Sequence, residues 1–107
     1  MGPKEVLEIL SKDENWHVRA RVAQNLKTSK EILEILARDK EYWIREYVAR
    51  NPNLPKKILK ILSKDKNWRV RTLIVKNPKI PKEILEILAK DKDSWIRASI
   101  AQTKRNS

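Results

Sequence analysis

The same pattern of residues returns every 26 positions along almost the whole chain. Each unit opens with a proline or serine, then a lysine, a charged residue and two aliphatic residues; these openings begin at Pro3, Ser29, Pro55 and Pro81. An aspartate column and an arginine column keep the same spacing, at Asp13, Asp39, Asp65 and Asp91 and at Arg19, Arg45, Arg71 and Arg97. Repeats of this length are typical of stacked arrays, because one unit cannot bury its apolar face alone. The sequence therefore predicts a single domain of four repeats, at residues 3–28, 29–54, 55–80 and 81–107.

Each repeat predicts two helices. The first helix begins at the proline. Proline has no backbone N–H, and at the first helical position the N–H of any other residue would lack an intrahelical acceptor. In the second repeat, where Ser29 replaces the proline, Thr28 and Glu31 predict a capping box. The second helix is short, spanning Trp68 to Lys76 in the third repeat, and Asn77 before Pro78 ends it. A helix this short leaves a partly 3₁₀ conformation open. The fold class is thus an all-α solenoid.

Residues 51–77 resemble the variant leucine-rich repeat in the pattern Asn-Pro-x-x-Pro-x-x-Ile-Leu-x-x-Leu-x-x-Asp-x-x-x-x-Val-Arg, followed by Asn77. The spacing of Asp and Arg, with an aliphatic residue before the Arg, also resembles HEAT repeats. The resemblance covers nearly the whole chain. It implies a right-handed superhelix and says little about function. One founding member of the variant leucine-rich family carries an iron–sulfur cluster on an extension, but this chain has no cysteine to hold one.

The composition argues against catalysis. The chain has no cysteine, one histidine (His17) and one glycine (Gly2), so thiolate sites, a histidine-based triad and a glycine-rich phosphate loop are not expected. We therefore expect a protein that is not an enzyme and binds no cofactor or metal.

No apolar run approaches the ~18 residues of a membrane span, and the first residues lack a signal-peptide core, so a cytoplasmic location is expected. The Lys, Ile and Glu content is similar to that of thermostable proteins.

The positive charge is concentrated in one repeat. The net charge is +11, and the four repeats carry +1, 0, +8 and +2. In the third repeat, Lys57 and Lys60 replace glutamates that the other repeats carry at both positions. The candidate nucleic-acid-binding residues are Lys56, Lys57, Lys60, Lys64, Lys66, Trp68, Arg69, Lys76 and Lys79. Such a cluster favours a polyanionic partner. A solvated lysine face, or pairing with glutamates of repeats two and four, is the alternative.

Two further columns have competing interpretations. Each arginine of the Asp and Arg columns can bind a carboxylate or a turn carbonyl in its own or the next repeat, which makes a structural ladder. The alternative is that these arginines face phosphates. The tryptophans alternate between two repeat positions, Trp16 and Trp68 at one and Trp43 and Trp95 at the next. They either pack the turn against the core or line an open face, where they would stack on bases or anchor a partner.

The leading interpretation is a non-enzymatic binding module that takes nucleic acid with little sequence preference. One alternative is a scaffold that binds an acidic protein or peptide. Another is a designed or consensus-derived repeat protein without an evolved ligand. Because neither end has a clear capping helix, a dimer through the end repeats is also open.

Overall fold

The computed structural model describes residues 1–103, which form eight α-helices and no strand. The helices are α1 (Pro3–Leu10), α2 (Trp16–Gln24), α3 (Lys30–Leu36), α4 (Tyr42–Ala49), α5 (Lys56–Ser63), α6 (Trp68–Val75), α7 (Lys82–Ala89) and α8 (Ser94–Ala101). The prediction of an all-α chain is confirmed. Residues 104–107, assigned to the fourth repeat from the sequence, lie outside the described residues.

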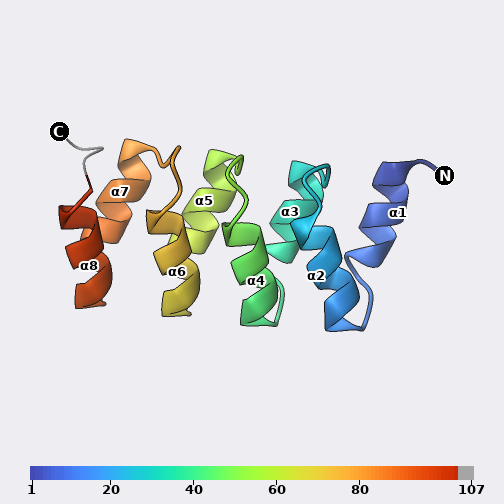
Figure 1. Cartoon of the computed structure of the whole chain (residues 1–107), viewed down its shortest axis with the longest axis horizontal. Helices are drawn as coiled ribbons and strands as arrows, with labels where there is room; N and C mark the ends of the chain where they lie inside the picture. Colours follow the sequence, from blue (N-terminus) through green and yellow to red (C-terminus); the bar gives the residue numbers. More distant parts are fainter. Residues whose placement is uncertain (104–107) are drawn as a thin grey trace.

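The helices form two rows. The odd-numbered helices make one row and the even-numbered helices the other, and the chain alternates between them from one end of the molecule to the other (Figure 1). The even helices contact their neighbours along the row, and α5 contacts α7 in the other. The molecule is elongated, with extents of 47 × 22 × 15 Å. No helix in residues 1–103 has the length and apolar character to cross a membrane.

The core lies between the two rows and is built from the repeated aliphatic positions. One such column, at Leu36, Leu62 and Leu88 on the odd helices, is completely buried. Its partners on the even helices, Ile44 and Val70, are buried to the same extent. These buried positions form one core cluster from α2 to α8, and Leu7 and Leu10 of α1 pack against it while only partly buried.

Three details of the helices resolve or correct the sequence predictions. The even helices are α-helices as long as the odd ones, and within residues 1–103 the 3₁₀ conformation that the sequence left open is limited to i−3 bonds at the helix ends, such as Ile44 N–H to Glu41 O at 3.1 Å. Helical i−4 bonds, such as Arg45 N–H to Glu41 O, begin already in the first turn. Pro55 is an N-cap residue that precedes α5. The predicted capping box was wrong: Ser29 Oγ caps α3 at Ile32 N–H, while Thr28 donates to Val22 O.

An arginine–aspartate ladder joins successive repeats. Arg45 donates from Nε and Nη2 to the two carboxylate oxygens of Asp65, at 2.7 and 3.2 Å, and from Nη1 to the carbonyl of Asp39 at 2.6 Å. Arg19 and Arg71 repeat this arrangement toward Asp39 and Asp91. Each arginine thus binds the turn carbonyl of its own repeat and the carboxylate of the next. These side chains are buried and fully engaged, so they are not free to bind phosphates.

Candidate nucleic-acid interface

Neighbouring repeats neutralise part of the excess charge of the third repeat. Lys56 pairs with Glu83 of the fourth repeat, and Lys57 pairs with Glu34 of the second at 3.2 Å. Arg69 donates from Nε to Glu46 at 2.9 Å. Five lysines of this repeat have no acidic partner within residues 1–103; they are Lys60, Lys64, Lys66, Lys76 and Lys79. Lys79 donates instead to the amide oxygen of Asn53.

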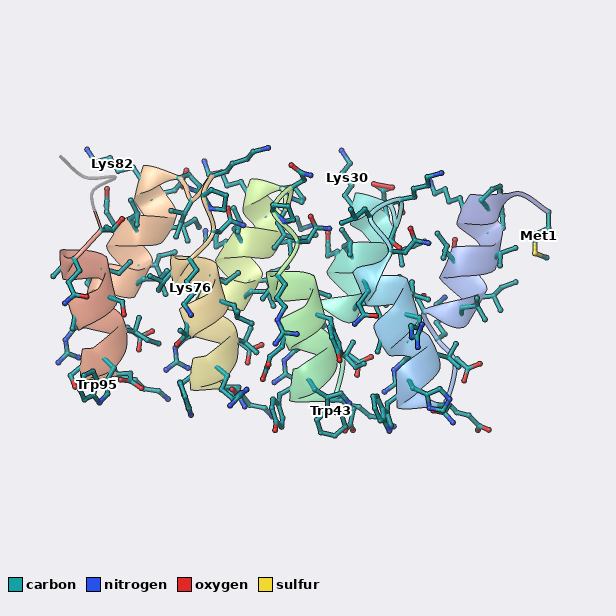
Figure 2. All side chains as sticks on the ribbon, viewed as in Figure 1. Met1, Lys30, Trp43, Lys76, Lys82 and Trp95 are labelled. Atoms are coloured by element: carbon teal, nitrogen blue, oxygen red, sulfur yellow. The ribbon has the colours of Figure 1, made fainter. Side chains whose placement is uncertain are left out.

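The structure does not bring the nine candidate residues into one patch. Figure 2 shows Lys30 and Lys82, at the starts of odd helices, along one long edge, and Trp43 and Trp95, at the starts of even helices, along the opposite one. Lys56 and Lys57 start α5 and belong to the first edge, and Lys79 lies in the turn that leads to α7 on the same edge. Lys64 and Lys66 lie between α5 and α6, at the other edge.

We call this second edge the turn edge; it consists of residues 11–15, 37–41, 64–67 and 90–93, which join each odd helix to the following even helix. Its cations, all exposed, are Lys12, Arg38, Lys40, Lys64, Lys66, Lys90 and Lys92. They occupy two columns of the 26-residue repeat. Glu14, Glu41 and Asp93 also lie in these turns, so the cations outnumber the carboxylates that the ladder leaves unpaired in repeats two, three and four but not in repeat one.

The excess of cations on the turn edge is concentrated in the turns of repeats three and four. There Lys64, Lys66, Lys90 and Lys92 line one open hollow of about 400 Å³. Two aspartates also line it, but Asp65 is bound by Arg45 and Asp91 by Arg71. The four lysines have no acidic partner within residues 1–103. The hollow consequently presents four ammonium groups, and the two carboxylates that line it are bound by arginines.

The sequence prediction missed Lys90 and Lys92. Charge counted by repeat hides them, because the glutamates of α7 lower the total of the fourth repeat. The available signal was the column itself, since Lys90 lies 26 residues after Lys64 and Lys92 lies 26 residues after Lys66.

The tryptophans divide between the two roles considered from the sequence. Trp43 is partly buried and meets the ring of Trp16 edge-on at 6.0 Å; its Nε1 is buried without a hydrogen-bond partner within residues 1–103. Trp68 is different, because 56% of its surface is exposed. It begins α6 two residues after Lys66, and the guanidinium of Arg69 lies 5.9 Å from its ring centroid. Trp95 is also exposed.

A second hollow, of about 210 Å³, lies between α4 and α6. Glu46 is buried there and is bound by both Arg50, at 3.5 Å, and Arg69. Trp68 and Lys76 also line it. This groove therefore combines one exposed aromatic ring with a net positive charge.

No arrangement in the described part of the chain indicates a metal centre. Residues 1–103 contain no group of three or more His, Cys, Asp or Glu side chains placed to hold a metal ion. His17 is exposed at the start of α2, where it meets the ring of Trp16 edge-on.

No protein-family model, curated protein or solved structure matches this chain. The resemblance to variant leucine-rich and HEAT-like repeats thus remains a prediction from the sequence motif. Function has to be argued from the residues of the site, since a fold alone does not determine it.

Proposed function

We propose that this chain is a non-enzymatic binding module that takes nucleic acid along the turn edge of repeats three and four. In this proposal the stack is a right-handed α-solenoid similar to variant leucine-rich and HEAT-like repeats. One observation carries the functional part: Lys64, Lys66, Lys90 and Lys92 share a hollow whose carboxylates are occupied by arginines. A phosphate backbone carries a row of negative charges, which can pair with these otherwise unpaired ammonium groups.

Binding of this kind is largely independent of sequence. Lysine acts on a phosphate as a point charge, and contacts to phosphate carry no information about the bases. Trp68 adds a stacking surface beside Lys66, and stacking accepts every base. The combination favours single-stranded nucleic acid. Its unpaired bases can unstack and pack on Trp68 while its phosphates contact the lysines.

The groove between α4 and α6 favours a second candidate, the binding of an acidic peptide. Its exposed Trp68 would anchor an apolar side chain, and Arg50 and Lys76 would face carboxylates. A Lys76→Glu variant separates the two functions, because Lys76 is the C-cap of α6, at the end of that helix far from the turn edge.

Fluorescence anisotropy with labelled single- and double-stranded oligonucleotides tests the main proposal. If each of the four lysines contacts one phosphate, raising the salt from about 50 to 200 mM weakens binding about 50-fold for a single strand and about 150-fold for a duplex. The variant Lys64→Glu/Lys66→Glu removes two of these contacts. We expect weaker binding at low salt and a salt dependence reduced to about half its slope.

The matched control is Lys57→Glu/Lys60→Glu, which changes the charge equally in the same repeat. Both replacements restore the glutamate of the other repeats, and both lie on α5, outside the residues of the turn edge. We expect this variant to retain the salt slope of the unmodified protein. Loss of binding in the control alone would move the site to α5, and binding that ignores salt would overturn the proposal.

A further inference from the structure

The ladder has one unused group at each end of the described stack. Arg19, Arg45 and Arg71 each bind the aspartate of the following repeat. Arg97, in the last repeat, and Asp13, in the first, have no such partner within residues 1–103. The two ends therefore carry opposite charges at the two positions that pair with each other at every internal junction.

Both groups are already held in the orientation that the internal junctions use. Arg97 donates from Nη1 to the Asp91 carbonyl at 2.6 Å, as Arg45 does to Asp39. Its Nε and Nη2, which bind the carboxylate at each internal junction, have no hydrogen-bond partner within residues 1–103. Asp13 accepts from the Asn15 N–H at 2.8 Å through Oδ1, as its internal counterparts do from theirs. Each half-site is thus pre-organised for the other.

The apolar surfaces at the two ends are those that internal junctions bury. At the amino-terminal end Val6 is 41% exposed, whereas its counterpart Ile32 is 2% exposed. At the other end Ala89 and Ala101 are exposed. The residues at the same positions of the second repeat, Ala37 and Ala49, are buried. The amino-terminal end offers larger aliphatic side chains, with Leu10 and Val18 also only partly buried, and the other end offers alanines. Each of these residues occupies a repeat position whose counterparts are buried at internal junctions.

A second charge pair continues in the same register. Lys4 pairs with Glu31 and Lys56 with Glu83, in each case from one repeat to the next. The next members of these columns are Lys82 at one end and Glu5 at the other; both are exposed. A copy docked in the internal register would therefore form Arg97–Asp13 and Lys82–Glu5 pairs at once.

We propose that copies of this chain stack head to tail, with the α7–α8 end of one copy seated on the α1–α2 end of the next. The two surfaces lie at opposite ends of the long axis (Figure 1). Such an interface is heterologous, so one contact leaves two free ends and assembly continues into linear oligomers. A closed dimer, which the sequence left open, is not expected. This proposal is independent of nucleic-acid binding.

Sedimentation velocity over a concentration series tests the stacking. We expect the average mass of the full chain to rise continuously with concentration, beyond that of a dimer. Asp13→Arg and Arg97→Asp each place like charges at the contact. Since loss of one partner of a buried ion pair costs about 3–5 kcal/mol, each variant alone should associate about a hundredfold more weakly or worse.

The decisive sample is the mixture of the two variants. Arg97 of the Asp13→Arg chain meets the natural Asp13 of the other variant, and the two replaced residues face each other at the alternate contact. Mixing should therefore restore association. Glu14→Arg and Lys66→Asp are controls of equal charge change on the exposed turn edge, and they should associate like the unmodified chain.

Three outcomes would overturn the proposal. One is a chain that stays monomeric at every concentration. Another is a mixture that associates no better than either variant alone. The third is a dimer that Arg97→Asp leaves intact, because such a dimer would not use the Arg97–Asp13 contact. Circular dichroism of each variant excludes misfolding as the cause of lost association.

Discussion

Replacement of Arg45 by alanine should destabilise the stack strongly. The Arg45 and Asp65 side chains are only 8% and 6% exposed, and they are joined by two hydrogen bonds. Without Arg45, the Asp65 carboxylate stays buried with one remaining donor, the Asn67 N–H. Removing one partner of a buried pair costs about 3–5 kcal/mol, because an uncompensated charge is left in a place of low polarity. A domain of this kind has only about 5–15 kcal/mol of stability in all.

The chain contains its own control for this experiment. Arg97 occupies the same repeat position, but it is exposed and binds only the carbonyl of Asp91. Its replacement by alanine loses one hydrogen bond, worth about 0.5–1.5 kcal/mol. Urea unfolding of dilute protein, followed by circular dichroism, gives both free energies. Equal losses in the two variants, or a loss below about 1 kcal/mol for Arg45→Ala, would refute the assigned role of the ladder.

Three further outcomes follow from the packing and the turn edge. Leu62→Ala, at a fully buried position, should lower the free energy of unfolding by about 2–5 kcal/mol, whereas Leu26→Ala, at a side chain 77% exposed, should change it by less than about 0.5 kcal/mol in the same urea assay. Asn67→Ala removes the cap that accepts from the Arg69 N–H at 2.8 Å, and thermal unfolding should show a loss of about 1 kcal/mol. Trp68→Ala should weaken single-stranded nucleic-acid binding by about 1–3 kcal/mol in anisotropy titrations and leave duplex binding unchanged.

The helices were largely predictable because their signals are local and repeated four times. The predicted helix from Trp68 to Lys76 is found at Trp68–Val75, where the Asn-Pro sequence ends it. The cap of α3 was not predictable to the same degree. Thr28 and Ser29 are adjacent hydroxyl residues, and either satisfies the pattern of an N-cap. Packing decides between them, since Thr28 is buried and its hydroxyl is used by the carbonyl of Val22.

The candidate site was harder to predict because charge pairing depends on how repeats stack. Glu34 lies 23 residues before Lys57, and Glu46 lies 23 residues before Arg69; both pairs form only across a junction. A count within the third repeat therefore overstated its free charge. The same count overlooked Lys90, whose alignment with Lys64 becomes a shared surface only when the turns lie side by side.

The location of the binding surface can be measured directly by nuclear magnetic resonance. A titration of ¹⁵N-labelled protein with a short single-stranded oligonucleotide reports each backbone amide separately. Nucleic-acid binding along the turn edge predicts the largest shift changes at residues 63–69 and 89–93, with little change at residues 56–60 on α5. Changes centred on α5 or on the turns that lead into the odd helices, or no changes at low salt, would contradict it.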